Sequence, residues 1–154
     1  MSTLNALTVA VEVASRKRDE ARRLLQEAQG AQHAAQDQLN QLQGYARETE
    51  GRWGMRADAA VQPEVMFHHY QFMDRLGHAV GLQTGVVSDH ASRVQDATRT
   101  LLEAELRLAS LRKVVEKRQQ DHERQQMRRE QKQTDERASI QVRNAINGPP
   151  GQEY

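Results

Sequence analysis

Six histidines are the side chains in this sequence best suited to metal binding or proton transfer. A helical metal pair needs two histidines four residues apart on one face, with a third ligand nearby. No two of the six have this spacing; they are His33, His68, His69, His78, His90 and His122. We therefore expect packed or edge-exposed histidines, with no metal and no cofactor.

Other catalytic groups are also missing from the sequence. Cysteine is absent, which excludes thiolate ligands, thiol nucleophiles and disulfides. No phosphate-binding loop or paired-carboxylate arrangement can be built, and long helices offer no concave pocket for a substrate. The sequence thus predicts a protein that is not an enzyme. It has no apolar run near the roughly 18 residues that span a bilayer and no signal-peptide layout, so we expect a cytoplasmic location.

Two long helices are predicted to carry these side chains. More than half of the 154 residues are strong helix formers, and aromatic residues make up only 4%. From Leu4 to Trp53 a seven-residue repeat places apolar residues at twelve of its fifteen a and d positions. A second register from Met66 to Val115 has an apolar residue at every a position, and its apolar stripe ends there. Such periods are typical of supercoiled helices.

The breaks between these repeats predict the chain topology. Gly51 and Gly54 should stop the first helix, and Pro63 should open the second. We expect helices at about 3–53 and 63–146, joined by a loop at about 54–62. Folding the chain back places Leu25 near Val94 and Leu7 near Leu111. The fold class is therefore all-α.

The predicted architecture is an elongated antiparallel coiled-coil hairpin, a single domain over 1–147 followed by a flexible tail at 148–154. The second helix should extend past its partner as a C-terminal overhang at 116–146. Nine basic and six acidic residues lie between Arg112 and Arg137. This overhang is either a solvated helix held by charge pairs or a segment that becomes ordered on a partner, and the two are compatible.

Two groups of residues in the hairpin suggest protein binding. Gly77, Gly81 and Gly85 recur every four residues, either as a flexible stretch or as a smooth strip that another backbone can approach. Large apolar side chains gather near the bend, and those off the seam are Tyr45, Phe67, Tyr70 and Phe72. These aromatics form either a protein-binding patch or a cap over the end of the hairpin.

Three motifs, in order, resemble the FliJ family of flagellar type III export proteins. The first is Gln38-Leu39 with Leu42, Tyr45 and Glu48. The second is Tyr70-Gln71-Phe72 with Leu76, Ala79-Val80 and Gln83, and the third is Glu130-Gln131-Lys132 with Asp135-Glu136 and Ala138. The resemblance covers nearly the whole chain. Where this chain has Thr49, the family often has an aromatic residue.

The resemblance implies a stalk-like coiled coil similar to the central stalk of rotary ATPases. Its implied partners are the hexameric flagellar export ATPase, the membrane export gate protein FlhA and export chaperones. The implied location is cytoplasmic, at the flagellar base, with the inner membrane reached only peripherally through the gate. The family's gate-binding patch maps onto Gln38, Leu42, Tyr45, Phe72, Leu76 and Ala79. The implied ATPase end comprises Glu130, Gln131, Lys132, Asp135 and Glu136.

Two alternatives to a flagellar protein remain. One is the equivalent stalk protein of a virulence type III secretion system, which shares this architecture. The other is a nucleic-acid-binding coiled coil that uses the arginine-rich strips 16–23 and 112–137. Acidic residues interleave both strips, whereas binding driven by phosphate needs a cleaner basic face, so we expect no nucleic-acid partner.

Overall fold

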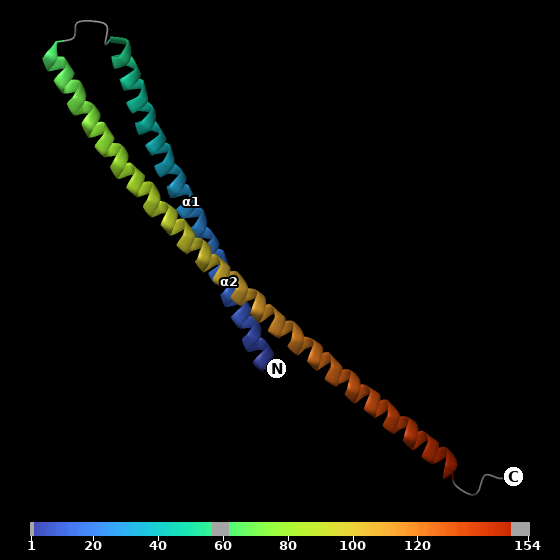
Figure 1. Ribbon diagram of the computed structural model, residues 1–154. Coiled ribbons are helices and arrows are strands. Elements are labelled where there is room, and N and C mark those ends of the chain that lie inside the picture. Colours follow the sequence, from blue (N-terminus) through green and yellow to red (C-terminus); the bar gives the residue numbers. More distant parts are fainter. Residues whose placement is uncertain (1, 57–61, 149–154) are drawn as a thin grey trace. The chain divides into compact units, whose positions relative to one another are not determined.

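The computed structural model describes residues 2–56 and 62–148 of the chain (Figure 1). These residues form two helices and no strand: α1, Ser2–Arg56, and α2, Pro63–Ile146. The all-α prediction is confirmed, and α2 has the predicted bounds. Residues 57–61 of the predicted loop and 149–154 of the predicted tail lie outside the described residues.

The end of α1 differs from the prediction, because the helix continues through Gly51 and Gly54 to Arg56. A glycine lowers helix stability by about 1 kcal/mol but, unlike proline, removes no backbone hydrogen bond. Trp53 stacks on His69 of α2 near the end of α1, with ring centroids 4.0 Å apart. This contact across the two helices offsets the weak helix propensity of the glycines.

The start of α2 is capped by the residue that precedes it. The backbone N–H groups of Val65 and Met66 donate to the Gln62 carbonyl, at 3.1 and 3.2 Å. Pro63 occupies the first helical position, where a missing N–H costs nothing, and Glu64 places a negative charge at the positive end of the helix dipole. These local signals explain why the predicted start of α2 is accurate.

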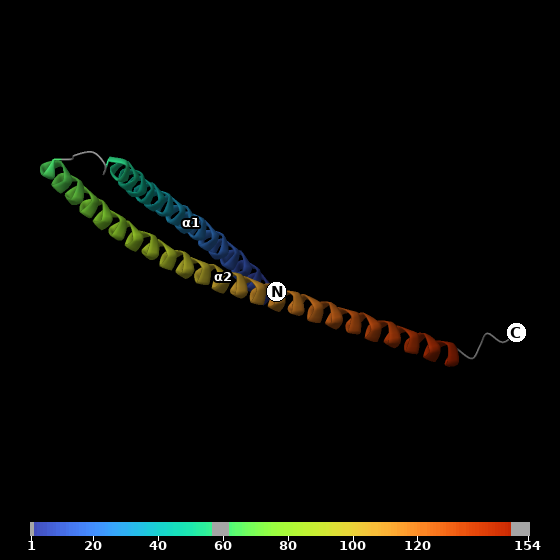
Figure 2. The ribbon, with the colours of Figure 1, turned by 45° about the horizontal axis from the view of Figure 1, so that its top comes forward.

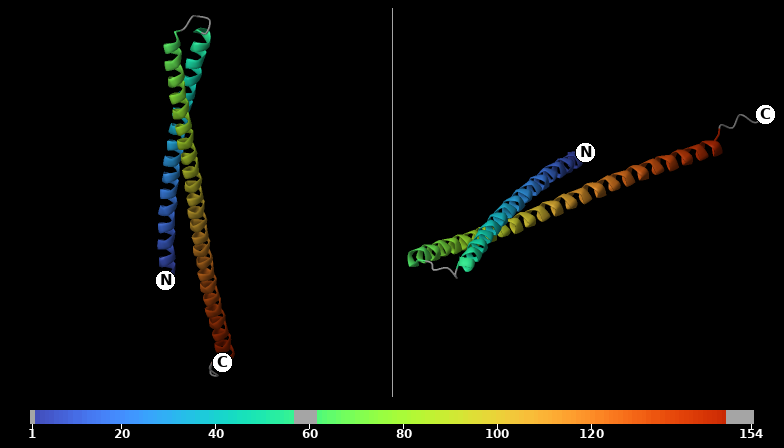
Figure 3. Two further views of the ribbon diagram at one scale, coloured as in Figure 1. Left: turned by 60° about the vertical axis from the view of Figure 1, so that its left-hand side comes forward. Right: turned by 90° about the horizontal axis from the view of Figure 1, so that it is seen from above.

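The chain divides into two compact units, which we describe separately. The hairpin unit comprises residues 13–107, and the C-terminal unit comprises residues 1–12 and 108–154. The prediction of a single domain over 1–147 stays a prediction. In the hairpin unit, α1 and α2 run antiparallel; Figure 2 shows the two segments alongside each other, and they cross in the views of Figure 3.

The helix-to-helix contacts of the hairpin unit confirm the antiparallel pairing. The side-chain amide of Gln83 donates to the backbone carbonyl of Ala35, at 3.0 Å. Nearer the bend, Tyr45 contacts Phe72. In the C-terminal unit, Thr8 and Val11 of α1 border the same surface hollow as Val115 of α2.

Burial follows the predicted seam closely. All fifteen predicted a and d positions of α1 are buried or half-buried, and so are fourteen of the fifteen on α2. The exception is Met66, which lies one turn before the Trp53–His69 contact and is 40% exposed. The buried apolar residues all occupy seam positions: Ala14, Ala21, Ala35, Leu39, Leu76 and Leu108.

The seam ends where the sequence predicts. Val115 is half-buried, and every described residue after it, through Gly148, is exposed. The helix nevertheless continues to Ile146, and the Asn147 N–H donates to the Arg143 carbonyl at its end, at 2.8 Å. The last 31 residues of α2 therefore bury no apolar stripe within the chain.

We expect residues 116–146 to exchange amide hydrogens much faster than residues 66–115 of the same helix. Exchange slows where tertiary packing opposes local opening, and the C-terminal segment has no such packing. Hydrogen-exchange mass spectrometry of the isolated protein measures both segments at once. Equal protection on both sides of Val115 would contradict this expectation.

Replacing Leu76 by Ala should lower the free energy of unfolding by about 2–3 kcal/mol, because its side chain is only 8% exposed in the seam. Leu102→Ala is the matched control, since Leu102 is an exposed leucine of the same helix, and it should change stability by less than about 0.5 kcal/mol. Thermal and urea unfolding of the two variants test this. Equal losses would show that the seam is not where the stability lies.

Candidate protein-binding site

The predicted gate patch lies in the hairpin unit, where both helices contribute to it. The rings of Tyr45 and Phe72 meet edge to face, with centroids 5.9 Å apart and an interplanar angle of 84°. The antiparallel pairing thus brings the two halves of the patch to the same level of the hairpin. Their role in binding a partner stays a prediction.

Burial divides the six predicted patch residues into two groups. Leu76 is buried, and Leu42 and Ala79 are half-buried, so these three help to hold the helices together. Gln38, Tyr45 and Phe72 are exposed; about half of Tyr45 and 41% of Phe72 remain accessible. Heptad geometry accounts for five of the six, because Leu42 and Leu76 occupy d positions while Gln38, Tyr45 and Phe72 occupy flanking g positions. Ala79 is also at a g position but is half-buried.

The rings of Tyr45 and Phe72 lie off the seam, but their contact joins the two helices. An edge-to-face aromatic pair contributes about 0.5–1.5 kcal/mol beyond its buried area. The two rings are therefore held in place but still accessible, which suits a preorganised binding surface.

The remaining aromatics near the bend separate into a packed pair and an exposed pair. Trp53 and His69 are both half-buried and stack on each other across the helices. Phe67 and Tyr70 are exposed, and their ring contacts are with their sequence neighbours His68 and His69. Trp53 and His69 thus pack across the helices, whereas Phe67 and Tyr70 remain exposed. The choice between a binding patch and a cap, made for Tyr45, Phe67, Tyr70 and Phe72, stays a prediction.

The predicted ATPase end lies on the exposed part of α2 in the C-terminal unit. Its residues are all solvent-exposed: Glu130, Gln131, Lys132, Asp135 and Glu136. The Thr134 hydroxyl donates to the Glu130 carbonyl within the helix, at 2.8 Å. Both signs of charge lie within two turns, which favours a partner surface of mixed charge. The binding role of this segment stays a prediction.

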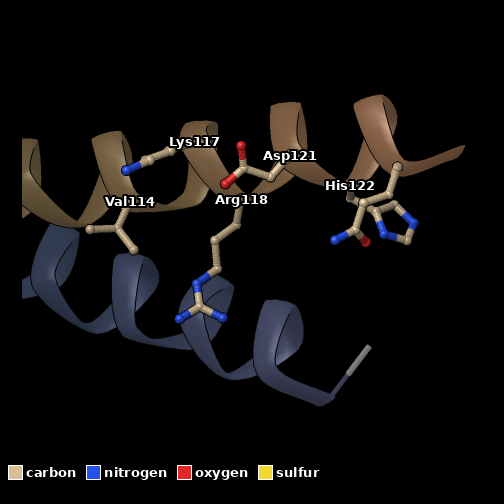
Figure 4. Close-up of a pocket in the computed structure, with 6 residues that line it drawn as sticks. Val114, Lys117, Arg118, Asp121 and His122 are labelled. Carbon is tan, nitrogen blue, oxygen red and sulfur yellow. The ribbon is translucent and has the colours of Figure 1, made fainter. Parts of the chain in front are cut away.

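A shallow, open hollow in the C-terminal unit was not anticipated from the sequence. Val114, Arg118 and His122 line one side of it, and the Arg118 side chain reaches over the first turns of α1 (Figure 4). Lys117, Asp121 and Gln125 complete the lining. Within residues 2–56 and 62–148, no three histidines or carboxylates are grouped in a way that would hold a metal ion.

Ion pairs reduce the free positive charge of the first arginine-rich strip. Arg23 donates hydrogen bonds to Glu20 and to Glu27 on the same helix face. The bond to Glu20, followed by the charges of both carboxylates, raises the pKa of Arg23, and the same bond lowers the pKa of Glu20. Arg18 pairs with Asp19, at 2.8 Å. The strip therefore presents mixed charge rather than a basic face for phosphates.

Neither described helix is long and apolar enough to cross a membrane. Among curated proteins, no sequence matches this chain. A solved structure, that of the YscO homolog CT670 from Chlamydia trachomatis, has the same fold, with a TM-score of 0.71 and 17% sequence identity. The match covers 97% of this chain and 96% of that one.

The family model described as the flagellar FliJ protein matches residues 3–147, nearly the whole chain. The matched span contains both helices, the full seam and all three motifs on which the resemblance was based. This chain therefore belongs to the FliJ family, whose members are stalk components of type III protein export.

Proposed function

We propose that this protein is a non-enzymatic component of the flagellar type III export apparatus, where it links the export ATPase ring to the gate protein FlhA and to export chaperones. The observation that carries the proposal is the pair of exposed, mutually packed rings of Tyr45 and Phe72 on a member of the FliJ family. On this proposal the protein is cytoplasmic and reaches the inner membrane only through its partners.

The two ends of α2 suit different partners. The bend end offers aromatic rings that a partner can bury, and such rings commonly dominate interface energies. The C-terminal segment offers charged and amide side chains on a helix with no apolar stripe, which favours polar contacts to a charged partner. We assign the gate to the first surface and the ATPase to the second.

A virulence-type secretion system is the second candidate setting. It is favoured by the structural similarity to a YscO homolog, a similarity that is one of fold. Deleting the gene and measuring both swimming and secretion of effectors separates the two settings. Loss of motility with intact effector secretion supports the flagellar assignment, and the opposite result would transfer the protein to the virulence system.

Replacing Tyr45 and Phe72 together by Ala should weaken binding to FlhA at least about tenfold, because each ring is an accessible aromatic anchor. The same change should cost only about 0.5–1.5 kcal/mol of stability, the value of the lost ring pair. Titrating purified FlhA from the same organism against each variant gives the affinity, and thermal unfolding gives the stability.

Tyr70→Ala is the control for this experiment, since Tyr70 is a more exposed ring near the bend that lies outside the predicted patch. It should leave FlhA binding unchanged. If the double variant unfolds far below the wild type while its folded fraction still binds FlhA normally, the two rings are a structural cap and the gate patch lies elsewhere.

Reversing the charge of Lys132 to Glu should weaken ATPase binding by about threefold to tenfold, and the loss should shrink at high salt because exposed charges are screened. Lys117→Glu provides a matched reversal on the same helix, outside the predicted ATPase end. Co-sedimentation with the purified ATPase compares the two variants. Equal effects would indicate a general electrostatic attraction rather than a specific contact.

A further inference from the structure

Besides the seam, α2 carries a second heptad row on a neighbouring face of the hairpin unit. The row, which we call the lateral row, has alternating steps of three and four residues; its members are Val65, His68, Phe72, Arg75, Ala79, Leu82, Val86, Asp89, Arg93 and Asp96. Its central members are Ala79, Leu82 and Val86, and the Leu82 side chain is 62% exposed. Alternating three- and four-residue steps are the spacing by which one helix packs against another.

The charges along this row change sign about Leu82. Arg75 lies seven residues before Leu82 and Asp89 lies seven residues after it; His68 and Asp96 lie fourteen residues away on the two sides. All four flanking side chains are exposed, and none has an ion-pair partner in the part of the chain that the structure describes. The row is thus apolar in the middle, with Arg75 on the side toward the bend and Asp89 and Asp96 on the other side. Arg93 is the exception, a basic residue of the row between the two aspartates.

We propose that the lateral row is a homodimer interface, in which the α2 helices of two copies pack antiparallel about a twofold axis near Leu82. A twofold axis there places Arg75 within a turn of Asp89 of the second copy and His68 within a turn of Asp96 of the second copy. Each pair occurs twice, as an isologous interface requires. Phe72 comes level with Arg93 of the second copy, a suitable arrangement for a cation–π contact.

The surface beside the row allows this close approach. Gly85 lies one turn from Leu82, and a side chain added at Gly85 would meet no atom within 4 Å, so nothing within this chain occupies the space. The length also suffices, because the row spans about 47 Å of helix at about 1.5 Å per residue. An amphipathic helix of another protein would have no reason to match the reversal of charge about Leu82, and the second copy matches it by symmetry.

The dimer would compete with the gate, a consequence that rests on the proposed function. Phe72 and Ala79 belong both to the lateral row and to the predicted gate patch, and Tyr45 contacts Phe72 directly. A second copy on the row would cover them, so self-association would withhold the patch from FlhA until the dimer separates.

Sedimentation equilibrium of the full-length protein over a wide range of concentrations tests the dimer without any other partner. We expect a monomer–dimer equilibrium that weakens at high salt. Leu82→Glu should raise the dimer dissociation constant at least about tenfold, because it places two carboxylates near the axis. Helicity measured by circular dichroism should not change, since Leu82 is exposed.

Charge reversals distinguish self-pairing from docking of another protein. Arg75→Glu and Asp89→Arg should each weaken the dimer by about threefold to tenfold, and the double variant should recover most of the loss because the pairs form again with opposite signs. Asp74→Arg, a reversal one residue off the row, is the matched control and should have no effect.

Two results would overturn the proposal. One is a protein that stays monomeric at every concentration. This includes the case in which the lateral row binds a different protein and Leu82→Glu abolishes that binding. The other is a double variant no better than the single reversals. Neither result bears on FlhA binding by Tyr45 and Phe72, which is measured separately.

Discussion

A seam between two helices can bury only about two residues in seven from each helix, and this limit shapes the whole protein. Six apolar residues are buried in the described chain, three of them alanines of the α1 d series. No third layer covers the remaining apolar side chains. These apolar side chains therefore stay exposed on the flanks of the hairpin unit. Their contact with water is unfavourable, and this free-energy cost is removed only when another protein covers them.

The alanine residues of the seam also influence how the two helices pair. Small side chains let the helix backbones approach, and at Ala35 this allows the Gln83 amide to donate to a backbone carbonyl of the facing helix. A polar residue in a seam reduces stability but specifies register, because only one alignment gives it a partner. Gln83 thus helps to specify the register of the seam, and with it the level at which Tyr45 lies opposite Phe72.

The sequence predicted the seam well because a heptad repeat records burial directly. The end of the apolar stripe at Val115 and the start of α2 at Pro63 were both correct, since each depends on local residue types. The end of α1 was wrong because the cross-helix stack of Trp53 on His69, invisible to propensity, outweighs two glycines. The Tyr45–Phe72 contact was missed for the same reason. The spacing of the lateral row is visible in the sequence, but only the structure shows that Leu82 at its centre is exposed and so could bind a partner.

The aromatic pair shows why structural and binding roles need not exclude each other here. Tyr45 and Phe72 stabilise the hairpin modestly through their contact, yet both residues remain exposed to solvent. A ring already held by its neighbour loses little conformational entropy when a partner covers it, so the same contact that contributes to the fold lowers the cost of binding. Phe72 is also part of the lateral row, and one exposed face cannot be covered twice. If both proposals hold, a second copy and the gate cannot cover this face at the same time, and the concentration of the protein itself would set how often the gate patch is free.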